Sequence, residues 1–249
     1  TSGAYTSNIE IENTATIDTG ANNVTISGNV TDDGTNALVK SGTGTLTLSG
    51  TNTASGSMTL NQGTLSVAAD GNLSAGTVTL NGGTLAVTGA TTIDNAIALG
   101  ASNGTVNVGA NVTMSGVVSG TGNLTKTGAS TLTLSGTNTY TGTTTVSGGT
   151  LSVSTDSNLG TGNVTLSGGG LAVTGATTID NDISGTGSLT KSGTGTVILS
   201  GTNTYSGGTT VNGGTLQVSG GSALADGGSV TVSSGATLDL NGTSETIGS

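Results

Sequence analysis

Two acidic side chains two positions apart, Asp180 and Asp182, are the strongest candidates for general acid and base chemistry in this sequence. Side chains alternate between the two faces of a strand, so this spacing would place both carboxylates on one face. Such a pair could in principle donate and accept a proton. A similar earlier segment reads Asp94-Asn-Ala96, however, and no base accompanies either segment. We therefore interpret these acids as part of a solvated surface.

The sequence lacks the residues that most other catalytic and metal-binding sites require. The sequence has no His and no Cys, and its three basic residues are all lysines. Neither a Ser-His-Asp triad nor a His- or Cys-ligated metal site can be built. Asp32-Asp33-Gly34 and Asp18-Thr-Gly20 could suggest calcium loops, but neither has EF-hand spacing, and Asp and Gly are common in turns. We predict no catalytic residue, no metal site and no cofactor.

Three lysines recur in similar surroundings: Lys40 in Val39-Lys-Ser-Gly, Lys126 in Thr125-Lys-Thr-Gly and Lys191 in Thr190-Lys-Ser-Gly. A repeated charge suggests a shared local role, such as a contact within a turn. An ion pair with an acid on a neighbouring turn of the fold is the alternative, and it would contribute little if exposed.

Two tyrosines also recur, Tyr140 and Tyr205. They could be exposed and stack on sugar rings, but we favour packing of the ring under a protruding loop, because tyrosine often buries its apolar body. The Asn-x-Thr sequons at Asn23, Asn111 and Asn163 are expected from the composition, and several lie in segments predicted to be strands.

The composition excludes an ordinary mixed α/β enzyme. The 249 residues include 47 glycines and 54 threonines, whereas only 6% are charged and 1% are aromatic. Typical globular domains have about 25% charged residues. The absence of Pro, the net charge of −10 and the slightly positive mean hydropathy argue against a disordered chain. Any core must be thin, aliphatic and repetitive.

The chain repeats itself on two scales. Large units begin near Lys40, Lys126 and Lys191, and the first unit is longer than the second by a segment that lies roughly at 98–123. Within the units, alternating strands recur with a period of about 20 residues, beginning at Thr45, Thr64, Thr84 and Thr105. The extra segment of the first unit is therefore one additional turn of the same period.

A period near 20 residues with two or three short strands predicts an all-β solenoid of parallel strands with about 12 coils. Apolar residues at alternate positions mark half-buried strands. Because each coil buries little alone, stacked coils must build the core, with Leu46, Leu65, Leu85 and Val106 in one inward column. A sandwich or propeller explains this period less well, and helices are not expected, because Gly and Thr disfavour them. About 12 coils would form a rod on the order of 60 Å long.

The run from Gly195 to Val218, with similar runs opening at Thr45 and Thr131, closely resembles the passenger-associated repeat of autotransporters, the type V secreted proteins of Gram-negative bacteria. The resemblance covers residues 39–249, whereas residues 1–38 match it poorly. It implies a right-handed parallel β-helix exported through the outer membrane. We expect an atypical segment at 1–38, a cap or assembly segment, followed by units at 39–123, 124–188 and 189–249.

We therefore expect an extracellular protein of the bacterial surface with a structural or adhesive role, and not an enzyme. A carbohydrate-active enzyme or glycan-binding passenger is the alternative. Nucleic acid and membranes are poor partners because the chain has no basic patch, and no segment reads as a signal peptide or membrane helix. Coil edges that no cap covers could pair with another copy, so we expect end-to-end association into a fibre or biofilm filament.

Overall fold

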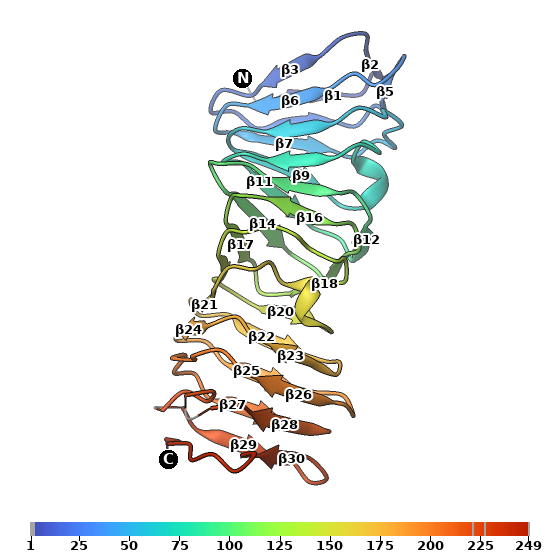
Figure 1. The fold of residues 1–249 in the computed structure, drawn as a ribbon. Helices are drawn as coiled ribbons and strands as arrows, with labels where there is room; N and C mark the ends of the chain where they lie inside the picture. Colours follow the sequence, from blue (N-terminus) through green and yellow to red (C-terminus); the bar gives the residue numbers. More distant parts are fainter. Residues whose placement is uncertain (1–2, 221, 227, 249) are drawn as a thin grey trace.

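Short strands of alternating inward and outward residues stack into one solenoid in the computed structural model, which describes residues 3–220, 222–226 and 228–248. All strand pairs in the five sheets are parallel, and partners lie about 20 residues apart, in about 12 turns. The coils follow one another from the N-terminal to the C-terminal end (Figure 1). The predicted all-β parallel solenoid is confirmed.

Each coil has three sides. The first side carries the ten-stranded sheet, whose members are, in stacking order, β1 (Gly3–Tyr5), β4 (Val24–Ile26), β7 (Thr45–Leu48), β9 (Thr64–Val67), β11 (Thr84–Val87), β14 (Gly104–Val108), β17 (Leu124–Thr127), β19 (Thr144–Val146), β21 (Val164–Leu166) and β24 (Ile183–Gly185).

The second side begins with a two-stranded sheet and continues as an eight-stranded one. Its strands are β2 (Ile9–Ile11) and β5 (Val30–Asp32), then β12 (Thr91–Ile93), β15 (Val112–Met114), β18 (Thr131–Leu134), β20 (Thr150–Val153), β22 (Gly170–Val173), β25 (Leu189–Lys191), β27 (Thr209–Val211) and β29 (Val230–Val232). Between the two sheets, irregular segments continue the stack through hydrogen bonds such as Thr53 N–H to Val30 O.

The third side carries a six-stranded and a four-stranded sheet. Its strands are β3 (Ala15–Asp18), β6 (Leu38–Ser41), β8 (Met58–Leu60), β10 (Val78–Leu80), β13 (Ile97–Leu99) and β16 (Val118–Gly120), then β23 (Thr177–Ile179), β26 (Thr196–Leu199), β28 (Thr215–Val218) and β30 (Thr237–Asp239). The segment around Tyr140 bridges these two sheets, since Thr139 N–H donates to Val118 O.

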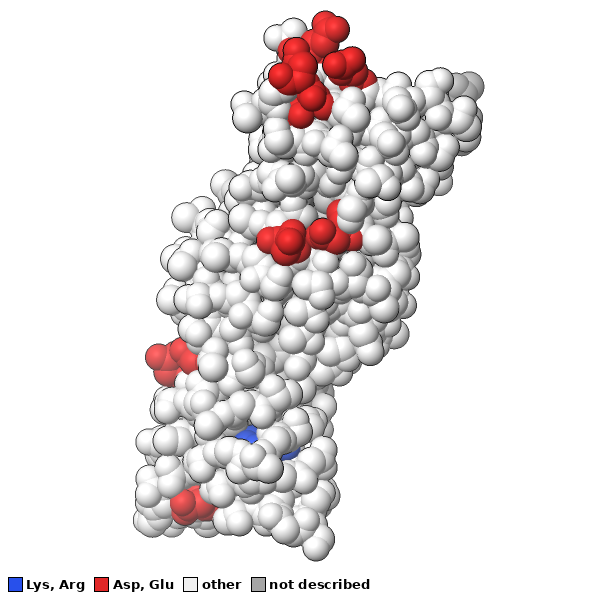
Figure 2. All heavy atoms as spheres, turned by 90° about the vertical axis from the view of Figure 1, so that its right-hand side faces the viewer, with Lys and Arg blue, Asp and Glu red and all other residues white. Residues whose placement is uncertain are grey.

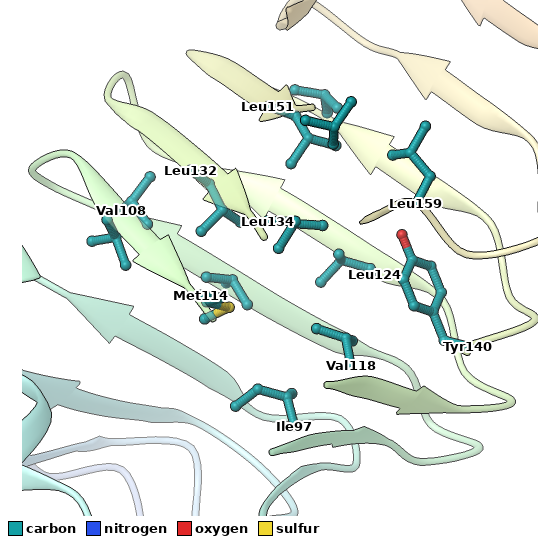
Figure 3. Packing of buried hydrophobic residues seen from close by; sticks show 14 of the residues in the cluster. Ile97, Val108, Met114, Val118, Leu124, Leu132, Leu134, Tyr140, Leu151 and Leu159 are labelled. Atoms are coloured by element: carbon teal, nitrogen blue, oxygen red, sulfur yellow. The ribbon is translucent and has the colours of Figure 1, made fainter. Parts of the chain in front are cut away.

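The core is one column of aliphatic side chains along the axis. Leu46 pairs with Leu65, Leu65 with Leu85, and Leu85 with Val106, and all four are fully buried, as predicted. Figure 3 shows side chains from successive coils converging on this shared interior. A coil alone could not shield such residues from water, so burial depends on stacking.

The three sequence units turn around the axis. Their first alternating strands, β7, β18 and β26, lie on the first, second and third sides respectively. The first two units are about four and three coils long, each with roughly a third of a coil in addition. That remainder moves each unit to the next side. Repeated sequence therefore does not form repeated columns, and the extra coil of the first unit, which includes β14, fits between β11 and β17.

Residues 3–38 form coils of the same stack. Strand β1 pairs with β4, which pairs with β7, and β3 pairs with β6. Strand β6 also spans the expected boundary between residues 38 and 39. The division into 1–38, 39–123, 124–188 and 189–249, and a capping or assembly role for the first segment, stay predictions.

Two single turns of 3₁₀ helix interrupt the strands, η1 (Asp70–Asn72) and η2 (Asp156–Asn158), where no helix was expected. The reason is local. The Asn72 side-chain oxygen accepts hydrogen bonds from the backbone N–H groups of Ala68 and Ala69 at 3.1 and 2.9 Å and so closes the turn; Asn158 closes η2 in the same way. Among the described residues, no helix is long and apolar enough to cross a membrane.

Replacing Leu151 by Asp is expected to destabilise the fold by several kcal/mol, because its side chain is fully buried between Leu132 and Leu171 and a carboxylate there would have no partner. Urea unfolding followed by circular dichroism measures the loss. The control is Ser152→Asp, whose side chain points outward on the same strand and should change stability little. Equal losses at both positions would contradict the inward and outward assignment.

Candidate functional site

The three lysines occupy inward positions of their strands. Lys126 pairs with Val106 in the coil before it and with Val146 in the coil after it, and its side chain is fully buried. Lys40 and Lys191 are equally buried, in β6 and β25. Because their units turn around the axis, the three lysines lie on three different sides of the solenoid.

Each ammonium group binds backbone carbonyls at a corner. Lys126 Nζ donates to the carbonyl oxygens of Thr127, Gly128 and Gly148 at 3.1, 3.0 and 2.9 Å. The first two belong to the turn after the lysine, and the third belongs to the next coil. Lys191 makes the same three contacts with Ser192, Gly193 and Gly213. The expected turn contact is present, and the partners are carbonyls rather than the carboxylates of the alternative.

These contacts stabilise the charged form, whereas burial opposes it. Desolvation lowers the pKa of Lys126 to about 8 and lowers the pKa of Lys191. Burial also lowers the pKa of Lys40, although the nearby Asp18 carboxylate acts in the opposite direction. Lys40 further donates to Thr19 Oγ1 at 3.1 Å. The three donors of an ammonium match the three carbonyls around Lys126 and Lys191, so each of these lysines links two coils, and Lys40 bonds to both neighbouring coils through Thr19 and Gln62. All three lysine side chains are fully buried.

The tyrosines are buried in the core. Tyr140 and Tyr205 have no exposed surface, and their hydroxyls lie 2.7 and 2.6 Å from the hydroxyls of Thr144 and Thr209. Figure 3 shows the Tyr140 ring near Val118, Leu124 and Leu159. Packing of the ring is confirmed, but the ring lies in the core rather than under a protruding loop. Neither ring is available to stack on a sugar.

The first repeat lacks this tyrosine and threonine pair. Ala54 and Met58 occupy the corresponding positions, and with Ser74 they line a small cavity of about 10 Å³. In the second repeat, Gly160 lies beneath the ring: a Cβ there would be 2.5 Å from the Tyr140 ring. Ser74 stands at the position of Gly160. In the first repeat, therefore, the ring is replaced by the small Ala54 and the glycine beneath it by Ser74.

Each Ser-Gly-Thr-Asn segment contains a buried asparagine that was not predicted from the sequence. Asn138 is mostly buried, its side-chain oxygen accepts the N–H of Val118 at 2.7 Å, and its amide donates to the carbonyl of Asn158. These partners belong to the coil before it and the coil after it, so one side chain joins three coils. Asn52 and Asn203 do the same. The constant position of Asn in all three copies was the available signal.

The paired acids do not lie on one strand. Strand β23 ends at Ile179 and β24 begins at Ile183, so the exposed Asp180 and Asp182 belong to the corner between them. The prediction of a shared strand face was wrong, because the alternation ends before Asp180. Asp182 accepts the backbone N–H of Thr202 at 2.7 Å, and Asp180 N–H donates to Asp156 at 3.4 Å. Burial and, less strongly, the Asp180 charge raise the pKa of Asp156. The carboxylates of Asp156 and Asp182 thus link neighbouring coils.

The other predicted turn and glycosylation positions are also structural. Asp18 accepts the N–H of Gly20 at 2.8 Å, which closes a turn, and Asp32 accepts the N–H groups of Ser55 and Gly56 in the next coil. Asn23, Asn111 and Asn163 are exposed and directly precede β4, β15 and β21, and these strands contain the other two residues of each sequon. Figure 2 shows acidic side chains in separate groups on a largely uncharged face.

Three segments, residues 38–67, 124–153 and 189–218, match the family model of the passenger-associated-transport-repeat. No curated protein and no solved structure matches this chain. Each matched segment contains one buried lysine and one bridging asparagine, so both belong to the repeat. The predicted resemblance is confirmed: the chain carries three of these repeats of autotransporter passengers. Repeats and fold together support a secreted or outer-surface protein of the passenger type.

Replacing Lys126 by Met is expected to lower the free energy of unfolding by about 3 kcal/mol, because three carbonyls lose their hydrogen-bond donor. The Met side chain has a similar length, so the aliphatic packing is retained. Chemical unfolding at neutral pH measures the change. Thr125→Met, at the outward neighbour on the same strand, is the matched control and should have little effect. A Lys126→Met protein as stable as the parent would show that the carbonyl contacts contribute nothing.

Tyr205 should make the fold less stable in alkali. Burial, above all, and the Glu245 charge raise the pKa of Tyr205 to about 12, although the bond to Thr209 lowers it. Between pH 10 and 12 the unfolded chain loses this proton while the folded chain keeps it, so the free energy of unfolding falls by about 2 kcal/mol.

The comparison that isolates this effect is Tyr205→Phe, because other groups titrate in the same range. Unfolding of both proteins at several pH values between 9 and 12 should show the Phe protein gaining relative stability as the pH rises. Tyr5→Phe, at an exposed tyrosine, is the control. A constant stability difference across this range would contradict the burial of the Tyr205 hydroxyl.

Proposed function

We propose that this chain, with its three passenger-associated-transport-repeats on one β-solenoid, is a structural and adhesive rod of the bacterial cell surface and not an enzyme. The observation that carries this proposal is the continuity of the stack. Parallel register runs from β1 to β30 through every coil. A rod without a hinge keeps whatever it carries at a fixed distance from its point of attachment.

The distribution of polar groups supports a mechanical role. The lysines and bridging asparagines are buried, and each links neighbouring coils. The tyrosine and threonine pairs are also buried, and each closes a hydrogen bond within one coil. Because the repeats turn around the axis, these links lie on all three sides rather than along one seam. Coils held together on three sides resist bending in every direction.

The chemistry of the surface supports a non-catalytic role. The sequence has no His, Arg or Cys, and all three lysines are buried. The one acidic pair worth considering, Asp180 and Asp182, is exposed at a corner, and the Asp182 carboxylate already accepts the backbone N–H of Thr202. Two carboxylates can hydrolyse a glycosidic bond when they flank it on opposite sides, whereas Asp180 and Asp182 lie exposed at one corner, and all three lysines that could assist attack on a uronate are buried. We therefore favour adhesion over the alternative of a carbohydrate-active enzyme.

The end coils supply a means of self-association. Val232, Leu240 and Ile247 are exposed apolar side chains in the last described coils, with 43%, 39% and 49% of their surface accessible. A further coil would cover them, whether it belongs to the same polypeptide or to a second copy. Contact between unlike ends propagates into a filament instead of closing as a dimer. The proposal is that copies of this chain stack in this way.

Introducing Val232→Lys and Leu240→Lys together should abolish this association, because charges at a coil edge oppose pairing with another chain. Light scattering and electron microscopy over a range of concentrations should show filaments for the parent and single rods for the variant. Beads coated with the parent should aggregate, and beads coated with the variant should stay dispersed.

Val117→Lys provides the matched control, since Val117 has the same exposed fraction of 43% but lies on the side of the solenoid. This control protein should assemble as the parent does. A parent chain that stays monomeric at high concentration would contradict end-to-end stacking, and unchanged assembly of the double variant would place the contact elsewhere.

A further inference from the structure

We infer that the corner before the first strands of the ten-stranded sheet is a binding groove for an uncharged polysaccharide chain lying along the solenoid axis, which rests on the adhesive role proposed above. The groove has a volume of about 590 Å³ and follows one corner over five successive coils. Its lining includes Asp18, Ser41, Thr43, Asn61, Gln62 and Asn81.

The groove is hollow because its corner turns are built on glycine. Gly42 has a φ of +76°, and a Cβ there would lie 2.4 Å from the backbone nitrogen of Gly20. The turns of neighbouring coils therefore pack closely and leave no side chain at these points. At about 4.8 Å per coil, five coils span about 20 Å. This length suits an extended chain of several sugars better than a single small molecule.

Its polar groups are arranged for hydroxyl ligands. The amide of Asn81 donates to the side-chain oxygen of Asn61 at 3.3 Å, and the Asn81 oxygen accepts the N–H of Ser102 at 3.3 Å. This arrangement leaves the Asn61 amide nitrogen and the exposed Gln62 side chain facing solvent. Carboxamides both donate and accept hydrogen bonds, as sugar hydroxyls do.

The groove continues onto a surface of the same chemistry. Beyond its corner, the outward residues of successive strands are in register: Thr45 with Thr64, Thr64 with Thr84, and Thr84 with Thr105. The column continues through Thr125 and Thr145. A polysaccharide lying along the axis would meet one threonine per coil beside the groove.

The charge of the molecule selects an uncharged ligand. Arginine is absent and all three lysines are buried, so no basic side chain reaches the surface to pair with a uronate, sulfate or phosphate. Lys40 lies beneath this corner, but its ammonium is bonded to carbonyls and fully covered. Among the described residues that line the groove, Asp18 alone is charged, and the net charge of the chain is −10. Anionic polymers would be repelled.

The first repeat alone carries the key side chain. Asn61-Gln62-Gly63 corresponds to Ser147-Gly148-Gly149 in the second repeat and to Asn212-Gly213-Gly214 in the third. Gln62 thus stands where the other repeats have glycine. This difference provides a mild substitution, Gln62→Gly, that restores the residue used elsewhere in the same fold.

The test is calorimetric titration of the full chain with uncharged hexasaccharides, namely cellohexaose, maltohexaose and mannohexaose, and with hexagalacturonate as the anionic comparison. We expect at least one uncharged hexasaccharide to bind and hexagalacturonate not to bind. Gln62→Gly and Asn61→Ala should each weaken that binding about tenfold, the effect of losing one or two hydrogen bonds. Asn212→Ala, at the counterpart of Asn61 in the third repeat, should leave it unchanged, and circular dichroism checks that each variant is folded.

Three results would contradict polysaccharide binding in the groove: no binding of any uncharged hexasaccharide, stronger binding of hexagalacturonate, or equal affinities of the parent and both groove variants. None of these results bears on assembly of coated beads, which tests the proposed rod separately. Loss of filaments with retained hexasaccharide binding would conversely leave the groove intact and remove end-to-end stacking.

Discussion

Parallel stacking of coils at a nearly constant interval along the chain is the constraint on which the rest of this structure depends. One coil has three short strands and no interior of its own, so each inward Leu or Val is covered only by the coils above and below it. Corners must stack as closely as strands. A Cβ on Gly44, for example, would lie 1.8 Å from the carbonyl oxygen of Asn22. The glycine content therefore reflects contact between coils as much as flexibility within turns.

Buried polar groups take the place of the large side chains that this chain lacks. Lys126, Asn138 and Tyr140 are large or polar side chains in the interior of the second repeat. Lys126 and Asn138 form hydrogen bonds across coil boundaries, and the Tyr140 hydroxyl bonds Thr144 within its own coil. An unpaired polar group at such depth would be costly, so these contacts penalise any shift of one coil against the next. The polar contacts therefore specify the register between coils. The aliphatic column supplies the buried apolar surface, but one Leu or Val can replace another there, so it specifies register less strictly.

The turning of the repeats has a consequence for function. Each repeat starts about a third of a coil further around the axis, so its buried lysine and bridging asparagine lie on a different side from those of the repeat before. The links between coils are therefore not concentrated on one side. Features confined to one repeat, such as Gln62, then occur at one corner of the rod only. A chain assembled from nearly identical repeats can in this way carry one local groove on a surface of mostly neutral side chains with scattered acidic groups.

The sequence by itself determined the parallel solenoid, its period, the inward column from Leu46 to Val106, and the presence of passenger-associated-transport-repeats, because alternation and period depend only on neighbours along the chain. The inward position of Lys126 was also present in the alternation from Leu124. Only the tertiary structure decided that its ammonium binds Gly148, that Asp180 and Asp182 lie at a corner, and that Asn61 and Asn81 form a groove. Each of these depends on which corner lies above which. That is set by the total number of residues between them, because a remainder of about a third of a coil moves a repeated position from one side of the solenoid to the next.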